Sequence, residues 1–151
     1  MAWLITCLSE TCGKQTWAAD IVDLIKNRLS PEGWIRCQCG QPGYVAKKFA
    51  LQEKGETWEP YLRGVVPLGE AGEVYQPFVF LVSYTPGGPI EDAWFSYYKD
   101  MRKSGGRLKL GYGPGGPPVL SWDDILSLVR HAIKNGLVRE QQVYEAIQRK
   151  V

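Results

Sequence analysis

The spacing of apolar residues predicts a helix near the start of the chain. Thr16 is a suitable N-cap, and Ser30 followed by Pro31 is a suitable end, because proline cannot continue a helix. Between them, apolar residues recur at helical intervals and share one face. They are Ala18, Ile21, Val22, Ile25 and Leu29. Short apolar stretches at 2–7 and 34–35 predict flanking strands, so we expect a strand–helix–strand unit.

Two further helices are predicted near the C-terminal end, after a Gly- and Pro-rich loop at 111–118. Ser121 can cap the first helix, and Asn135 with Gly136 can end it in left-handed backbone. Its apolar face is continuous and consists of Trp122, Ile125, Leu126, Val129, Ala132 and Ile133. A shorter apolar face over residues 140–149 predicts the last helix.

The middle of the chain has the pattern of β-strands. Residues 44–52 and 58–66 predict a hairpin that turns at 53–56. Residues 78–82 are apolar on both faces, which is typical of a buried central strand. Residues 107–112 alternate between apolar and polar positions, which predicts a strand with one solvated face.

Residues 92–103 fit either type of element. Their apolar residues follow helical spacing, acidic residues precede them, and basic residues follow, all of which favours a helix. The same segment is rich in aromatic residues, which are typical of strands. We prefer the helix, and the strand is the alternative.

Together these elements predict an α+β fold with C-terminal helices packed on an antiparallel sheet. The chain has 151 residues, of which 44% are hydrophobic and 23% charged, as expected for a single globular domain. Its expected parts are an N-terminal zinc-stapled unit at 1–43, a β-rich core at 44–112 and helices at 119–151. No membrane-spanning segment or secretion signal is recognisable, so we expect a cytoplasmic protein.

The four cysteines form two close pairs, Cys7 with Cys12 and Cys37 with Cys39. A reducing compartment favours metal binding over disulfides, and a disulfide between residues as close as Cys37 and Cys39 would be strained. Four thiolates are a typical ligand set for zinc. The sequence therefore predicts one structural Zn²⁺ site that joins the two ends of the strand–helix–strand unit. Iron, or buried thiols without a metal, are the alternatives.

The cysteine pattern resembles the knuckles of zinc-ribbon and rubredoxin-like proteins. The resemblance covers Cys7 to Gly40, where Gly40 follows the second pair directly. The spacings here are C-x4-C and C-x-C-G, whereas the usual knuckle is C-x2-C-G. A site closed by four thiolates leaves no ligand position for catalysis.

Candidate catalytic groups are few. The only histidine, His131, lies in a predicted helix. Two pairs of adjacent carboxylates fall where predicted helices begin, which explains them as favourable N-terminal charges. They are Glu91-Asp92 and Asp123-Asp124. No phosphate-binding P-loop is present, so we expect a protein without enzymatic activity.

A basic and aromatic segment suggests a binding function. The net charge of +2 is too small to indicate nucleic-acid binding by itself. Within one segment, however, basic residues are interleaved with tyrosines, a combination that suits single-stranded nucleic acid. The residues are Tyr97, Tyr98, Lys99, Arg102, Lys103, Arg107 and Lys109. A solvated face above core aromatics is the alternative interpretation.

Two functions follow from these observations. The first is a non-enzymatic zinc-binding protein that contacts nucleic acid or a nucleoprotein assembly through this segment. The alternative is a protein–protein adaptor or regulator that uses exposed aromatic residues and the Gly/Pro loop, since Trp, Tyr and Arg are good interface anchors. The salt dependence of binding distinguishes the two functions, because phosphate contacts weaken steeply as the salt concentration rises and apolar contacts do not.

Overall fold

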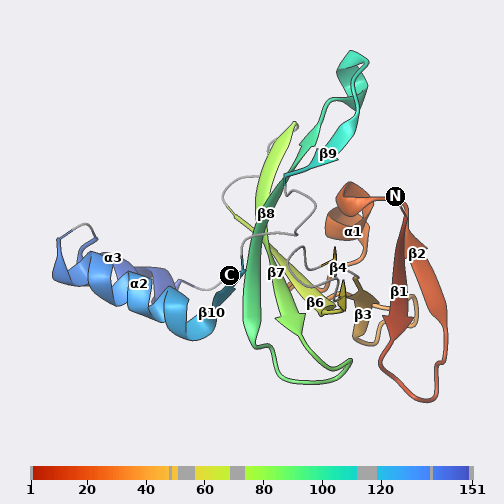
Figure 1. Ribbon diagram of the computed structural model, residues 1–151, viewed down its shortest axis with the longest axis horizontal. Coiled ribbons are helices and arrows are strands. Elements are labelled where there is room, and N and C mark those ends of the chain that lie inside the picture. The colour runs from red at the N-terminus through yellow and green to blue at the C-terminus, as the bar shows by residue number, and fades with distance from the viewer. Residues whose placement is uncertain are drawn as a thin grey trace. The chain divides into compact units, whose positions relative to one another are not determined.

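Antiparallel strands dominate the first of two compact units, and helices dominate the second. The computed structural model describes residues 2–47, 49–50, 57–68, 74–111, 119–136 and 138–149 (Figure 1). The units are Met1–Val119 and Leu120–Val151. An antiparallel sheet with separate C-terminal helices makes this an α+β protein, as predicted. The single domain expected from the sequence stays a prediction.

One sheet organises the first unit. Its strands are β1 (Trp3–Cys7), β2 (Gln15–Ala18), β3 (Gly43–Ala46), β6 (Tyr61–Pro67), β7 (Tyr75–Ser83), β8 (Asp92–Asp100) and β9 (Leu108–Leu110). They follow the order β8-β7-β6-β3-β1-β2, and β9 pairs with β8. Each neighbouring pair is antiparallel. The apolar segment 78–82 lies within β7 and is largely buried, which confirms the predicted central strand.

The predicted hairpin over residues 44–52 and 58–66 is confirmed by strand pairing. β3 pairs with β6, and farther along, the short strands β4 (Phe49–Ala50) and β5 (Thr57–Trp58) pair with each other. The predicted turn at 53–56 lies outside the described residues.

The first helix is shorter than predicted. α1 spans Ile21–Asn27, and its N-cap is Asp20, whose carboxylate accepts hydrogen bonds from two amides of the first turn. Thr16, the predicted N-cap, and Ala18 instead lie in β2, because this segment pairs with β1. Residues 34–35 form isolated bridges. The N-terminal region is therefore a hairpin followed by a helix, and not a strand–helix–strand unit.

The preferred helix over residues 92–103 is wrong. β8 occupies Asp92–Asp100 and pairs with β7 along eight register positions. Alternate side chains from Trp94 to Tyr98 are buried, which is the periodicity of a strand. This long pairing overrides the local helix signals, because each register pair adds cross-strand contacts that a helix would lose. A single 3-10 turn, η1 (Arg102–Ser104), then leads to β9.

One hydrophobic core joins β1, β7, β8 and α1. Phe78 and Phe80 of β7 are buried, with ring centroids 4.9 Å apart. Trp94 of β8 is fully buried opposite Phe80, and Trp3 of β1 stacks on Phe80 at 5.8 Å. Leu24 of α1 belongs to the same cluster. Each large apolar side chain contributes roughly 1.5–3 kcal/mol on burial, so the core holds these elements together.

The second unit contains two amphipathic helices, as predicted. β10 (Val119–Ser121) leads into α2 (Trp122–Lys134), where Ser121 and Asp124 form a capping box. α3 (Glu140–Gln148) follows. The packing of these helices on the sheet stays a prediction. Of the helices described, none has the length and apolar character that crossing a membrane requires.

Candidate metal centre and basic–aromatic face

Strand pairing brings the two cysteine pairs together. Cys7 is the last residue of β1, and Cys12 lies in the loop that leads to β2. Cys37 and Cys39 lie in the turn that leads to β3. β1 and β3 are antiparallel, with Cys7 opposite Gly43, so the end of one strand lies beside the beginning of the other. Both loops therefore emerge at the same end of the sheet.

Two tight turns fix the backbone around the sulfurs. In the first, the Cys12 amide donates to the Ser9 carbonyl at 3.1 Å. In the second, the Cys37 amide donates to the Gln41 carbonyl at 2.8 Å, and the Gly40 amide donates to the Cys37 carbonyl at 2.9 Å. Gly40 has φ of 88°, which side chains disfavour, so glycine allows this turn to close.

The four sulfurs have the spacing of a tetrahedral metal site. All four lie within 4.8 Å of one another, and none is in a disulfide. The Sγ atoms of Cys7 and Cys39 are 3.6 Å apart, and those of Cys12 and Cys37 are 3.8 Å apart. Metal–sulfur bonds of about 2.3 Å place the corners of a tetrahedron about 3.8 Å apart. The cysteine cluster can therefore hold a metal ion.

The surroundings give the thiols different acidities. Burial is the main cause that raises the pKa of Cys7 to about 12. At Cys39, a backbone hydrogen bond from Gln41 is the main cause that lowers the pKa to about 7. Four thiolates this close repel one another, and a cation among them removes the repulsion. A bound cation would therefore favour full ionisation of the cluster.

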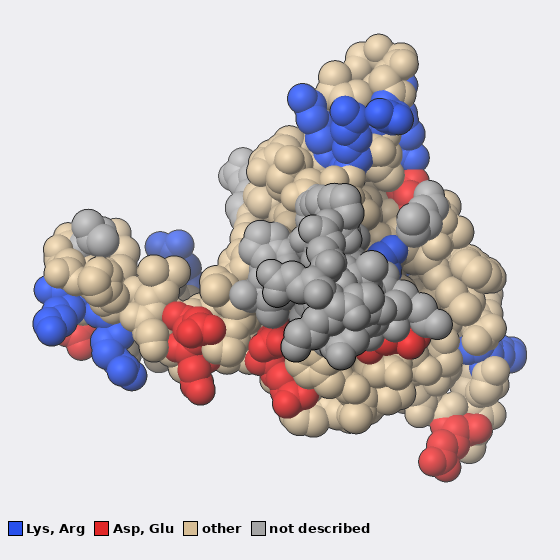
Figure 2. All heavy atoms as spheres, in the orientation of Figure 1, with Lys and Arg blue, Asp and Glu red and all other residues tan. Residues whose placement is uncertain are grey.

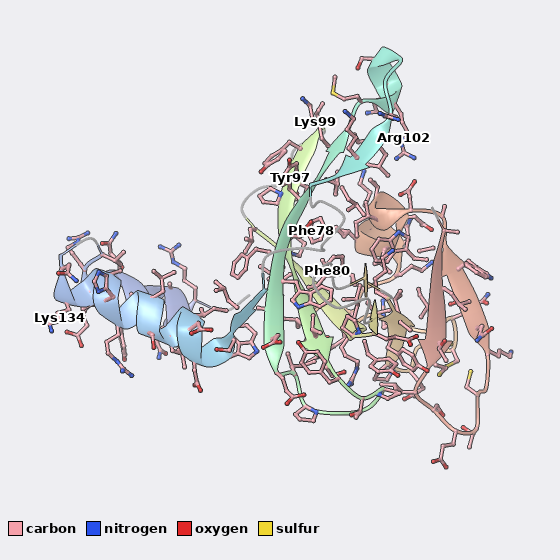
Figure 3. The ribbon with its side chains drawn as sticks, viewed as in Figure 1. Phe78, Phe80, Tyr97, Lys99, Arg102 and Lys134 are labelled. Carbon is pink, nitrogen blue, oxygen red and sulfur yellow. The ribbon has the colours of Figure 1, made fainter. Side chains whose placement is uncertain are left out.

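Strand register places two of the lysines that were predicted to bind nucleic acid side by side. Lys99 of β8 is opposite Lys109 of β9 and also opposite Tyr75 of β7. Tyr97, labelled with Lys99 in Figure 3, lies two residues from Lys99 on the same side of β8. Its ring centroid is 5.1 Å from that of Tyr75. All four side chains are exposed. We refer to Tyr75, Tyr97, Lys99 and Lys109 as the basic–aromatic face.

The other residues that were predicted to contact nucleic acid lie partly on the surface and partly in the core. Lys103 and Arg107 are exposed near the turn between β8 and β9, where Figure 2 shows basic side chains gathered. Tyr98 is only 4% exposed and lies beside Phe78 in the core, with ring centroids 6.4 Å apart. Successive residues of a strand point to opposite faces, so Tyr98 does not share the surface of Tyr97.

Arg102 contacts two carboxylates of the protein itself. Its Nη1 donates to Oδ2 of Asp20 at 2.7 Å, and its Nη2 donates to Oδ2 of Asp100 at 2.7 Å. A third hydrogen bond runs from Nε to Asp100 at 2.9 Å. Since Asp20 is the N-cap of α1, Arg102 joins the end of β8 to the beginning of the helix. Its guanidinium therefore has a structural role.

The sequence analysis does not identify Tyr75, which lies in a different strand from Tyr97. Only the register of β7 against β8 brings these rings together. Gly111 supports Tyr97 from the other side: its amide donates to the Tyr97 carbonyl at 2.8 Å, and a Cβ on Gly111 would lie 2.0 Å from the Tyr97 ring. Gly111 begins the predicted Gly/Pro loop, whose other residues, 112–118, lie outside the described residues.

No protein-family model matches the chain, and neither a curated protein nor a solved structure matches it. The functional argument therefore starts from the cysteine cluster and the basic–aromatic face.

Proposed function

We propose that this protein binds zinc through its cysteine cluster and single-stranded nucleic acid through its basic–aromatic face. The main support for nucleic-acid binding is that Lys99 of β8 and Lys109 of β9 lie directly opposite each other in the sheet. Like charges in directly opposed positions destabilise a sheet. A phosphate group bound between the two ammonium groups would remove this repulsion, so the pair suits an anionic ligand.

The two tyrosines supply the second half of such a site. Tyr75 is 50% exposed and Tyr97 is 38% exposed, so both rings are accessible to a base. Stacking of a base on an aromatic side chain contributes about 1–3 kcal/mol and tolerates any sequence. Bases are free to stack in this way only when they are unpaired. The combination of stacking and phosphate contact therefore favours single strands over duplexes.

Zinc is the metal that we propose for the cysteine cluster, in a site of the zinc-ribbon or rubredoxin-like knuckle class. Four thiolates at tetrahedral spacing form a closed coordination sphere, which is the arrangement of structural zinc. The metal would hold the end of β1 to the beginning of β3, and no position would remain for a substrate. Elemental analysis of the purified protein tests this assignment: one zinc per chain is expected, and iron in its place would contradict it.

The test of nucleic-acid binding is a salt series with labelled single-stranded DNA, single-stranded RNA and duplex DNA. We expect the affinity for single strands to fall linearly with salt on logarithmic axes. Each lost phosphate contact reduces the slope by about 0.7, so the double substitution Lys99→Gln and Lys109→Gln should reduce it by about 1.4. Tyr97→Leu should weaken binding at every salt concentration, by about 1–3 kcal/mol for each lost stacking contact.

The matched control removes two positive charges elsewhere. Lys14 and Lys134 are exposed and lie outside the basic–aromatic face, so Lys14→Gln with Lys134→Gln should leave the slope unchanged. Equal losses in the two double variants would attribute binding to net charge alone and contradict the proposed site. Unchanged binding after replacement of Lys99 and Lys109 would also contradict it, and the lysines would then serve to discourage pairing at a sheet edge.

Exposed apolar side chains on the C-terminal helices support a second candidate, a protein–protein adaptor. Leu126 of α2 is 59% exposed, and Tyr144 and Ile147 of α3 are 59% and 72% exposed. Groups of large exposed apolar side chains are typical of surfaces that contact a partner. Such a contact would persist at high salt, in contrast to the phosphate contacts of the first candidate.

A further inference from the structure

A second group of basic side chains lines a pocket beside the cysteine cluster. The pocket has a volume of about 280 Å³. Its lining residues are Asn27, Arg28, Arg36, Cys37, Gln38 and Gly40. No carboxylate is among these lining residues, whereas four of the side chains carry N–H donors. Typical small-molecule sites measure about 300–1,000 Å³, so this pocket has the size for a small anion.

Backbone carbonyls hold both arginines in place. Nη2 of Arg28 donates to the Trp17 carbonyl at 3.1 Å, and Nη2 of Arg36 donates to the Leu29 carbonyl at 3.0 Å. The amide of Arg36 donates to the carbonyl of Arg28 at 2.8 Å, so the two residues are neighbours in space. A guanidinium has five N–H donors, and one carbonyl contact leaves most of them available. The two side chains are therefore oriented in advance for another acceptor.

One of these donors lacks an acceptor. Nε of Arg28 is buried and has no hydrogen-bond partner among the residues that the structure describes. A buried donor without a partner is unfavourable, and more so when the group is charged. The nearby carboxylate of Asp23 accepts from Asn27 and from the Ala19 amide, each at 2.8 Å. The Nη groups that one carbonyl contact leaves available on each guanidinium are therefore the donors that an anion in the pocket would engage.

We propose that this pocket binds a phosphate group, either as a free ion or small phosphate ester, or at the end of a nucleic acid. The planar fork of a guanidinium matches two oxygens of a phosphate, and two arginines at one pocket can share its charge. The Cys37–Gly40 turn forms part of the pocket wall, so a metal bound by the cysteine cluster would fix the backbone on this side of the pocket. The site is separate from the basic–aromatic face and does not require it.

The test is an NMR titration of the zinc-loaded full chain that follows the Nε–H signals of its arginines. The probes are inorganic phosphate, adenosine 5′-monophosphate, and an oligonucleotide with and without a 5′-phosphate. We expect the signals of Arg28 and Arg36 to shift with each phosphate-containing probe. Tighter binding of the 5′-phosphorylated strand than of its unphosphorylated counterpart assigns the site to nucleic-acid ends. Equal binding of the two strands, with shifts in free phosphate, assigns it to free phosphate or a small phosphate ester.

Two variants test the role of the arginines. Arg36→Gln removes an exposed side chain with a single backbone contact, and it should weaken phosphate binding about tenfold, as expected for one charge-assisted hydrogen bond. Arg28→Lys keeps the charge but removes the guanidinium fork that matches two phosphate oxygens, and it should also weaken binding. Arg130→Gln, an exposed position on α2, is the matched control and should bind as the wild type does.

Two results would overturn the proposal. The first is the absence of any shift at Arg28 and Arg36 with inorganic phosphate, and the second is wild-type affinity in Arg36→Gln. The double variant of Lys99 and Lys109 keeps the pocket intact, so it should bind inorganic phosphate normally. This measurement distinguishes failure of the pocket from failure of the basic–aromatic face.

Discussion

Arg102 has a structural role, in contrast to the basic side chains around it. It contacts the carboxylates of Asp20 and Asp100, although its own side chain is 47% exposed. A single exposed ion pair contributes about 0–1 kcal/mol, but a fork that engages two carboxylates also fixes geometry. Replacing Arg102 would disturb the hairpin that carries Lys109. Loss of nucleic-acid binding in such a variant would therefore say little about phosphate contact.

The Arg102 contacts predict a particular response to acid. Hydrogen bonds from Arg102 are the main cause that lowers the pKa of Asp100 to about 2, from an ordinary value of 3.8. A carboxyl group with a lowered pKa stabilises the fold above its ordinary pKa, and the contribution is lost as pH falls toward the lowered value. Arg102→Gln should therefore lower the unfolding midpoint at neutral pH, and the difference from wild type should vanish between about pH 4 and pH 2. A difference that persists below this window would contradict the assignment.

Elements whose signals lie within their own residues, such as an apolar face or a cap, could be predicted from the sequence. Elements that depend on pairing with a distant strand could not. α2 combines a continuous apolar face with a cap at Ser121, and both signals lie within the helix itself. The segment 92–103 carries helix signals of the same local kind, but its pairing with β7 decides the outcome. Thr16 also carries a local cap signal, but pairing with β1 places it in a strand.

The same distinction applies to the two sites. The proximity of the four cysteines could be predicted, because two short spacings and a glycine are typical of a metal-ligand set and can be recognised without knowledge of the sheet. The basic–aromatic face could be predicted only in part, since Lys99 and Lys109 lie in a recognisable segment but Tyr75 does not. Which side of β8 each tyrosine faces depends on the strand assignment. Tyr97 is consequently exposed, and Tyr98 is in the core.

The capping box of α2 provides a test at the level of one element. The Ser121 hydroxyl accepts a hydrogen bond from the Asp124 amide at 3.1 Å, and the Asp124 carboxylate accepts one from the Ser121 amide at 3.2 Å. Ser121→Ala should cost about 1 kcal/mol and reduce the helical signal in circular dichroism. Ser127→Ala, at an exposed position inside the same helix, is the control and should be neutral or slightly stabilising. Equal losses in both variants would mean that the cap does not stabilise the helix.

The position of the cysteine cluster in the sheet order extends its influence over the first unit. β1 and β3 are neighbours in the order β6-β3-β1-β2, and the cluster lies at the end where they meet. β1 contributes Trp3 and Ile5 to the core, and α1 contributes Ile21 and Leu24. Release of β1 would therefore expose a large part of that core. Structural zinc supplies about 10–16 kcal/mol in small zinc-binding peptides, which is comparable to the whole stability of a domain.

Removal of one ligand should consequently unfold the N-terminal part of the sheet. We expect Cys39→Ser to lose its metal and to lose hydrogen-exchange protection in β1, β2, α1 and β3. The amides of β7 and β8 should keep more protection, because these strands pair along eight register positions without help from the cluster. Treatment of the wild type with a chelator is the control and should give the same pattern. A metal-free variant with the thermal stability of the wild type would contradict the structural role, and the thiols would then be ordinary buried side chains.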